Sequence, residues 1–189
     1  MTLFPEWDVR SYCIPDQPEG IHDAETKKIA IPKIEELVDS LSGEDFDGII
    51  ISCADDPAVD NLRKQLRIPV IGAGRSTALL AMSLGRRIGV IGITDGTPAG
   101  MKDILRDSLV KEIRPSGIHS TLDLMTSEGR SSVLREASVL KEVGADVIAL
   151  ACTGMSTVSL APELKDKVDI PVIDPVSAEG FFMWAALEL

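Results

Sequence analysis

"DGIIISCADDPAVDNLRKQLRIPVIGAG" (Asp47–Gly74) and "ADVIALACTGMSTVSLAPELKDKVDIPVIDPV" (Ala145–Val176) are two versions of one pattern. In each, an acidic residue precedes a continuous apolar run, and a cysteine ends that run. A polar turn and an amphipathic stretch then lead to the tetrapeptide Ile-Pro-Val-Ile. Such self-similarity indicates a duplicated half-domain. We therefore expect two pseudo-symmetric halves, over residues 1–84 and 85–189, with the last helix of the first half free to pack on the second.

The apolar runs predict the type of sheet. They lack polar alternation, which is typical of strands that are covered on both faces in a parallel sheet. The second half predicts strands at Arg87–Ile93, Ile118–Leu122, Val147–Cys152 and Pro171–Ile173, with helices that include Pro98–Val110 and Ser131–Val143. The first half predicts strands at Val9–Ile14, Ile49–Cys53 and Pro69–Ile71, and a helix over Ala24–Leu41 that Pro32 kinks or starts. This alternation indicates an α/β fold of two Rossmann-like halves with mostly parallel sheets.

The first half lacks a first strand and helix that the second half has. A strand–helix–strand unit takes roughly 30 residues, so about 20 residues are expected before Met1. A late start, a trimmed chain and a fold that tolerates the loss all remain open.

Composition excludes several classes of protein. The chain has 189 residues, of which 44% are hydrophobic, and no apolar run is long enough to span a membrane. A net charge of −11 disfavours nucleic acid as a partner. Three widely spaced cysteines disfavour a disulfide framework and a zinc site. With an acidic start that is unlike a signal peptide, the chain is expected to be soluble and cytoplasmic.

Cys53 and Cys152 are the candidates for chemistry. Ligands of parallel sheets bind beyond the carboxyl ends of the strands, where both cysteines lie. The amides of a following helix are expected to lower the pKa of each thiol. Since the duplication relates the thiols by an approximate two-fold axis, a small molecule between them presents opposite faces to each. One thiolate can then remove a proton while the other thiol delivers one.

A simpler interpretation exists for each cysteine. A cysteine at the end of a buried strand is most often a small hydrophobe. The matched positions of Cys53 and Cys152 favour chemistry over this alternative. Cys13 has no counterpart in the second repeat, so it is expected to be structural.

The motifs resemble those of the aspartate/glutamate/hydantoin racemase superfamily, and within it the hydantoin racemase branch. They are "CIPDQPEGI" (Cys13–Ile21), "IISCADDPAV" around Cys53, "IPVIGAG" (Ile68–Gly74), "LACTGM" around Cys152 and "IPVIDPV" (Ile170–Val176). The resemblance covers nearly the whole chain from about Asp8. It implies two α/β halves, no cofactor, no metal, and proton transfer by Cys53 and Cys152.

The resemblance also implies where substrate binds. Thr153 and Gly154 are expected to donate hydrogen bonds to a carboxylate or imide oxygen, and Ser52, Ala54 and Asp55 to line the other side. Amino-acid racemases of this superfamily usually carry Asn-Thr after the first cysteine, whereas this chain has Ala54-Asp55-Asp56. A fixed carboxylate there repels the carboxylate of an amino acid. A neutral ring, such as a 5-substituted hydantoin or allantoin, is therefore favoured.

Two further residues are placed near the same edge. Ser76, in "GAGRSTALL", caps a helix or contributes to the rim of the site. Thr94, in "TDGTP", follows the first strand of the second half and is expected at the mouth. The aromatic residues in "EGFFMWAALEL" are either core or a contact between copies, and we expect a homo-oligomer.

The sequence therefore predicts a cofactor-independent racemase of a small cyclic amide or an amino acid. Three alternatives stay open. The first is a maleate-type isomerase of the same superfamily. The second is a decarboxylase of that superfamily, although such decarboxylases rely on one cysteine. The third is a ligand-binding protein without activity.

Overall fold

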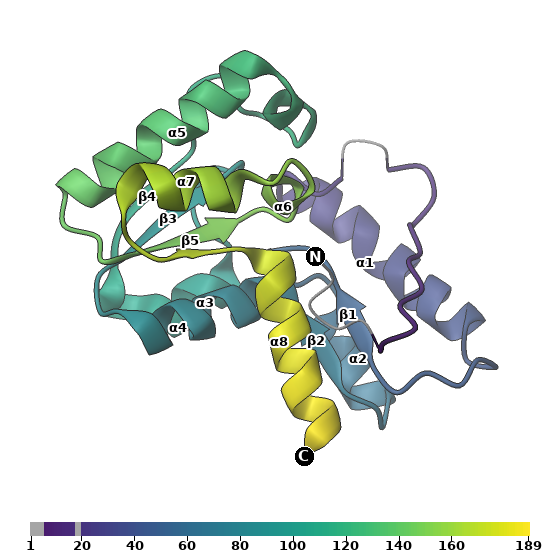
Figure 1. Cartoon of the computed structure of the whole chain (residues 1–189). Coiled ribbons are helices and arrows are strands. Elements are labelled where there is room, and N and C mark those ends of the chain that lie inside the picture. The colour runs from purple at the N-terminus through teal and green to yellow at the C-terminus, as the bar shows by residue number, and fades with distance from the viewer. Residues whose placement is uncertain (1–5, 18–19) are drawn as a thin grey trace.

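Two parallel sheets form the centre of the computed structural model, which describes residues 6–17 and 20–189 (Figure 1). The smaller sheet pairs β1 (Ile49–Ile51) with β2 (Val70–Gly72). The larger sheet has the order β4-β3-β5-β6, and its strands are β3 (Ile88–Gly92), β4 (Leu109–Ile113), β5 (Val147–Ala151) and β6 (Val172–Ile173). All these neighbouring strands are parallel, which confirms the predicted α/β class.

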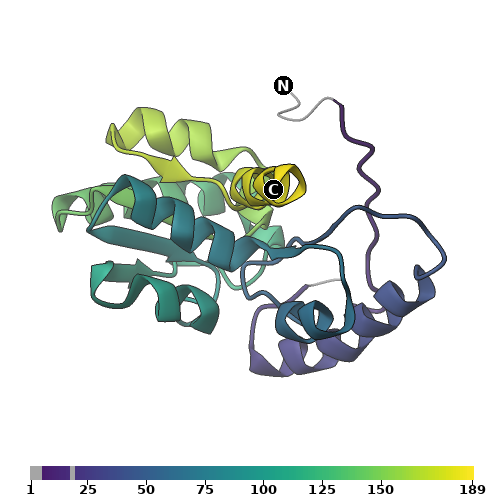
Figure 2. The same ribbon diagram turned by 90° about the horizontal axis from the view of Figure 1, so that it is seen from below.

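Helices cover both faces of the larger sheet. They are α1 (Ala24–Ser40), α2 (Val59–Gln65), α3 (Ala73–Leu84), α4 (Ala99–Leu105), α5 (Ser127–Glu142), α6 (Gly154–Thr157), α7 (Leu160–Val168) and α8 (Pro175–Glu188), with short 3₁₀ turns at Arg106–Ser108 and Leu122–Met125. Helices α5 and α7 pack on one face, and α3 and α4 on the other (Figures 1 and 2). Helices α1 and α2 lie with the smaller sheet.

Strand β5 shows why the apolar runs have no polar alternation. Ile148 and Leu150 belong to the core under α5 and α7, whereas Val147, Ala149 and Ala151 belong to the core under α3 and α4. All five side chains are buried. A strand between two helical layers has no face for polar residues.

The two repeats form the same strand pairing. The N–H of Ile49 donates to the carbonyl of Pro69, and the N–H of Ile148 donates to the carbonyl of Pro171, both at 2.9 Å. Each isoleucine is also paired in register with the valine that follows that proline. The quoted stretches therefore fold alike locally, while the two-fold relation of whole halves stays a prediction.

Helices α3 and α8 connect the two sheets. Although α3 follows β2, it packs against α4, β5 and α8. Helix α8 follows β6 and reaches back to β1 and β2. Each sheet is thus covered partly by the helix that follows the other sheet. The division into residues 1–84 and 85–189 stays a prediction.

The predicted helix over Ala24–Leu41 is confirmed as α1. It begins at a capping box, in which the carboxylate of Asp23 accepts the N–H of Thr26 while the Thr26 hydroxyl accepts the N–H of Asp23. Pro32 lies inside the helix.

The strand predicted at Val9–Ile14 is wrong. These residues are exposed or half-buried and form no strand. Side chains hold the segment instead: Arg10 pairs with Glu44 at 2.9 Å, and Tyr12 meets the edge of the Phe46 ring. Without a ladder of backbone hydrogen bonds, an extended apolar pattern does not make a strand.

The strand predicted at Ile118–Leu122 is also wrong. The carboxylate of Asp123 accepts the N–H groups of His119 and Ser120, at 2.9 and 2.8 Å, and so bends this segment into a turn. The strand that pairs with β3 is β4, at Leu109–Ile113. The helix predicted at Pro98–Val110 correspondingly ends at Leu105, where Arg106 takes a positive φ of 45°.

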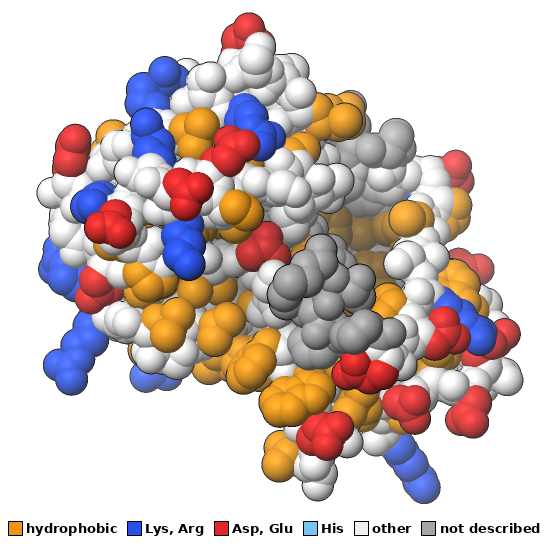
Figure 3. Space-filling view, in the orientation of Figure 1, with side chains coloured by type: hydrophobic (Ala, Val, Ile, Leu, Met, Phe, Trp, Pro, Cys, Tyr) orange, Lys and Arg blue, Asp and Glu red, His pale blue; other side chains and the backbone are white. Residues whose placement is uncertain are grey.

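Hydrophobic side chains gather on the outer face along α8 (Figure 3). Phe181 is 45% exposed and Trp184 is 41% exposed. The predicted homo-oligomer stays a prediction. Among the described helices, none has the length and apolar character needed to cross a bilayer.

Replacing Gly74 by Ala is expected to destabilise the fold. Gly74 lies in the first turn of α3, and a Cβ there collides with the carbonyl of Ala54, which is backbone and cannot move aside cheaply. We expect a loss of about 1–3 kcal/mol in the free energy of unfolding, measured by urea denaturation. Gly43→Ala is the control, because a Cβ at Gly43 meets open space. Equal stability of the two variants contradicts this packing.

Candidate active site

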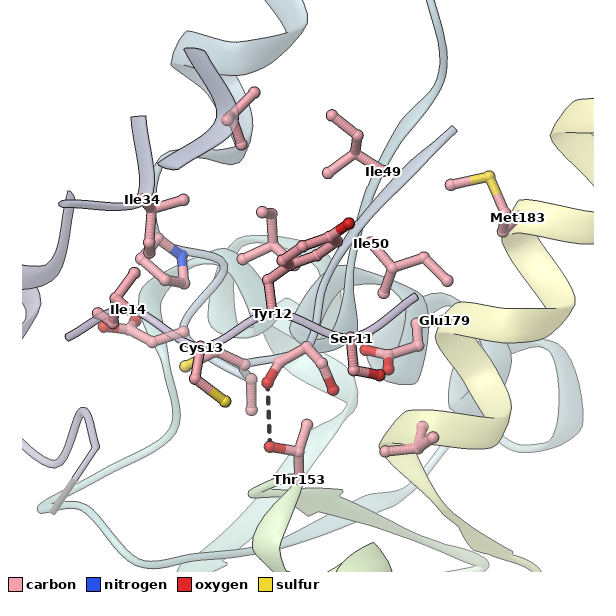
Figure 4. A pocket seen from close by; sticks show the side chains of 18 of the residues that line it. Ser11, Tyr12, Cys13, Ile14, Ile34, Ile49, Ile50, Thr153, Glu179 and Met183 are labelled. Carbon is pink, nitrogen blue, oxygen red and sulfur yellow. Dashed lines mark hydrogen bonds between the residues drawn. The ribbon is translucent and has the colours of Figure 1, made fainter. Parts of the chain in front are cut away.

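Cys53 and Cys152 line the same cleft, which has a volume of about 2220 Å³. Its walls come from residues 6–14, from α1, from the segments after β1, β3 and β5, and from α8 (Figure 4). Small-molecule sites occupy roughly 300–1000 Å³, so the cleft has room for a small ring. Its place beyond the carboxyl ends of parallel strands is the one expected for ligands of such sheets.

The turns that follow the two cysteines begin alike. The carbonyl of Cys53 accepts the N–H of Asp56 at 3.0 Å, and that of Cys152 accepts the N–H of Met155 at 3.1 Å. They then diverge, because α6 begins two residues after Cys152, whereas α2 begins only at Val59. A helix start directly after the cysteine is thus found at Cys152 alone.

A hydrogen bond joins the neighbours of the two cysteines. The hydroxyl of Thr153 donates to the carbonyl of Ser52 at 3.2 Å, across 101 positions of sequence (Figure 4). Because each partner is adjacent to one of the cysteines, this bond holds the ends of β1 and β5 together. Cys152 is close enough for its charge to raise the pKa of Cys53.

Burial governs the pKa values of both thiols. It raises the pKa of Cys53 to about 12, and the N–H of Asp55 opposes this effect only partly. Burial likewise raises the pKa of Cys152 above its ordinary value, against the N–H groups of Gly154 and Met155. The expected net lowering of the two pKa values is therefore wrong. The backbone amides do favour the thiolates, but loss of water outweighs them.

The structure brings most predicted site residues together. Those that line the cleft with the cysteines are Ser52, Ala54, Asp55, Thr94 and Thr153. Ser76 does not line it, because its hydroxyl is buried and donates to the carbonyl of Gly72 at 2.7 Å. Gly154 is half-buried and does not line the cleft; its N–H favours the thiolate of Cys152, and a Cβ there would meet the Thr121 side chain.

Asp55 and Asp56 have different partners. Asp55 forms an ion pair with Lys27 of α1 at 2.9 Å, and the same ammonium group donates to the Asp55 carbonyl. Asp56 accepts the N–H groups of Gly74 and Arg75, both at 2.8 Å, and so caps α3. Lys27 therefore offsets the negative charge that the sequence places beside Cys53.

Sequence reasoning missed Glu179, which lines the cleft from α8 (Figure 4). Only 3% of this residue is exposed, and its Oε2 has no hydrogen-bond partner among the described residues. Burial raises the pKa of Glu179 to about 8; Ser52 lowers this pKa, and Asp174 and Asp56 raise it. Its one sequence signal is an acidic residue inside the mostly apolar stretch that forms α8, whose other acidic residue, Glu188, is at the C-terminal end.

Lys27 was also missed, since it lies on the predicted helix at a position with no motif.

Among residues 6–17 and 20–189, no group of three or more His, Cys, Asp or Glu side chains is arranged to hold a metal ion.

The exposed Cys13 lines the same cleft, so its expected structural role is not what the structure shows. An α/β fold with the thiols of Cys53 and Cys152 at the strand ends of one cleft defines a class of proteins, and the comparisons identify it. The model of the Asp/Glu/Hydantoin racemase family matches residues 7–179, so the chain belongs to that family. The hydantoin racemase of Rhizobium meliloti is 28% identical over 170 residues, which cover 86% of this chain and 69% of that protein. The predicted family and the predicted class of enzyme, an isomerase of the racemase type, are thereby confirmed.

Solved structures show the same fold. The allantoin racemase of Klebsiella pneumoniae has a TM-score of 0.77 at 24% identity, over 89% of this chain and 71% of that one. The allantoin racemase of Pseudomonas fluorescens has a TM-score of 0.83 at 21% identity, over 96% and 78%.

The buried carboxyl of Glu179 is expected to make stability depend on pH. Its native pKa of about 8 lies above the ordinary value of 4.5, so the native state binds more protons between these values. This contribution to stability is full below about pH 4.5 and is lost as pH rises through about 8, with a slope of at most about 1.4 kcal/mol per pH unit. Glu179→Gln removes that slope.

Urea denaturation of both proteins from pH 5 to pH 9 measures the difference. The stability of Glu179→Gln relative to the unmodified protein should grow with pH and level off above about pH 8. A difference that does not change with pH contradicts the burial of this carboxyl. Glu142→Gln, at an exposed position of α5, is the matched control.

Proposed function

We propose that the chain is a cofactor-independent racemase of a small neutral cyclic amide, of the 5-substituted hydantoin or allantoin type. Cys53 and Cys152 are the acid/base pair that moves the proton at the stereogenic carbon. The observation that carries this proposal is the pair of thiols, which end equivalent strands of two repeats and line one cleft.

The proposed reaction balances with one proton on each thiol in turn. The thiolate of Cys53 takes the proton from one face of the ring carbon, and the electron pair of that C–H bond moves onto the adjacent carbonyl as an enolate. The thiol of Cys152 then gives its proton to the opposite face. The enantiomer is formed, the two cysteines have exchanged roles, and the reverse reaction uses them in the opposite order.

Burial makes ionisation of either thiol costly, so the single thiolate that the reaction uses needs hydrogen-bond donors beside it. Burial raises both pKa values, and the charge of Cys152 raises that of Cys53 further, so the form with two thiolates is suppressed. The N–H of Asp55 on one side and those of Gly154 and Met155 on the other can each hold a thiolate when it forms.

Charge near the cleft supports a neutral substrate. Asp174 and Asp56 raise the pKa of Glu179, and Asp55 and Asp56 raise the pKa of Cys53. Lys27 is engaged by Asp55. A further carboxylate bound among these groups adds repulsion. The relatives that are hydantoin racemases and the structures that are allantoin racemases agree with a ring substrate.

A substrate panel in deuterated buffer tests the proposal. Proton NMR should show loss of the signal of the hydrogen on the stereogenic carbon with 5-substituted hydantoins or allantoin, faster than without enzyme. Aspartate and glutamate should keep theirs. Exchange confined to the amino acids overturns the choice of substrate, and no exchange with any compound favours a binding protein.

Cys53→Ala and Cys152→Ala should each abolish racemisation. Loss of a positioned acid or base costs about 10²–10⁴-fold in rate. Polarimetry of the active compound measures the rate, and circular dichroism checks that the variants fold. Cys13→Ala removes the third thiol that lines the cleft, which has no counterpart in the second repeat, and should keep the activity because Cys13 is not one of the proposed acid/base pair. Full racemisation by either of the first two variants contradicts the two-thiol mechanism.

A further inference from the structure

Glu179 is an unusual residue for the inner face of a helix. Its neighbours on the buried face of α8 include Ala178, Gly180 and Met183, which are small or apolar. An ionised carboxylate at such a position costs several kcal/mol unless a cation or donors surround it. Buried polar groups almost always have hydrogen-bond partners, yet Oε2 of Glu179 has none among the described residues. A group kept at this cost requires an explanation.

Ser52 links Glu179 to the proposed chemistry. The Ser52 side chain is the polar neighbour that favours the ionised form of Glu179. Ser52 is itself exposed in the cleft and directly precedes Cys53. Its carbonyl is fixed by the hydroxyl of Thr153, so its backbone is held in place. The carboxyl of Glu179 therefore lies beside the Ser52 hydroxyl, and both residues line the cleft.

Burial, and then two acidic neighbours, keep the carboxyl of Glu179 neutral. Asp174, at the start of α8, and Asp56, in the turn after β1, both raise its pKa, which burial brings to about 8. No cation in the described part of the chain is among the groups that shift the pKa of Glu179. Lys27 of α1 pairs with Asp55, and Arg75 of α3 pairs with Asp60. At neutral pH, Glu179 is therefore mostly a carboxylic acid, which has an O–H to donate.

The protonation of Glu179 decides what the Ser52 hydroxyl can do. A neutral carboxyl can donate to Ser52 Oγ, which leaves the hydrogen of Ser52 free for a substrate oxygen. A carboxylate can only accept, so it draws the Ser52 hydrogen toward itself and away from the cleft. A buried carboxylic acid that is kept neutral for hydrogen bonding is a known device of enzymes that stabilise enolates.

We propose that Glu179 is a positioning and specificity-determining residue: as a neutral carboxylic acid, it orients the Ser52 hydroxyl to donate to an uncharged carbonyl oxygen of the ring. This inference rests on the proposed function for the identity of the ring. It assigns Ser52 as the group that touches the carbonyl and Glu179 as the group that acts through it.

Ring binding as a function of pH tests the proposal without turnover. The probe is a 5-substituted hydantoin methylated at N3, which removes the acidic imide hydrogen, and its affinity is measured by calorimetry from pH 6 to pH 9. The unmodified protein should lose up to about tenfold in affinity as pH rises through about 8, as one hydrogen bond is lost. Glu179→Gln, which is neutral throughout and keeps a donor, should bind with constant affinity.

Two further variants separate this role from a structural one. Ser52→Ala should bind the ring more weakly at pH 6 and should show no dependence on pH, because the hydroxyl that transmits the change is gone. Glu142→Gln should keep the pH dependence of the unmodified protein. A pH dependence that persists in Ser52→Ala or in Glu179→Gln overturns the proposal.

Racemisation measured in parallel separates the two proposals. Ring binding with the expected pH response, but no proton exchange at the ring carbon, removes the racemase function and leaves the role of Glu179 standing. Proton exchange at the ring carbon, together with a pH response that is the same in all variants, removes the role of Glu179 and leaves the racemase function standing. No binding of the neutral ring by the unmodified protein overturns the role of Glu179.

Discussion

One backbone hydrogen bond, made once in each repeat, sets the position of the chemistry. It runs from Ile49 to the carbonyl of Pro69 and, in the second repeat, from Ile148 to that of Pro171. The register that follows makes each cysteine-bearing strand end beside the strand of an Ile-Pro-Val-Ile segment. The bond from Thr153 to the Ser52 carbonyl then joins the two strand ends. The shared cleft depends on this geometry.

Burial has two effects on this cleft. It packs the strands between helical layers, and it removes the water that stabilises charge on the groups at their ends. The thiols and Glu179 therefore all have raised pKa values. A site of this kind holds little negative charge at one time, which suits the transfer of a single proton and an uncharged substrate. The same lack of water makes the few donors, such as Ser52 and the amides after Cys152, more effective.

Local patterns in the sequence predict the parts of the fold that depend on burial alone. Strand β5 is predicted within one residue because a run between two helical layers must be continuously apolar. The strand predicted at Ile118–Leu122 fails because the Asp123 carboxylate captures backbone N–H groups, which is a side-chain effect that hydrophobic periodicity does not contain. The extended pattern at Val9–Ile14 fails because a strand also needs a partner.

Local patterns in the sequence also predict part of the candidate site. The cysteines follow from the repeat, and five of the seven predicted binding residues line the cleft. Of the two alternatives for Ser76, the rim of the site is not supported, because its buried hydroxyl donates to the carbonyl of Gly72 at the start of α3. Glu179 was missed because its importance arises only when α8 crosses to β1, far away in the sequence. The raised thiol pKa values depend on the sum of burial and nearby charge, which no single motif reports.

The fate of deuterium at low conversion tests the central claim, that two thiols act on opposite faces of one carbon. One pure enantiomer of a 5-substituted hydantoin is incubated in deuterated buffer, and both enantiomers are separated and analysed by mass spectrometry, with the spontaneous exchange subtracted. Two thiols predict deuterium in the newly formed enantiomer, while the recovered starting enantiomer keeps its hydrogen. Equal deuterium in both enantiomers from the start requires a single base and contradicts the account.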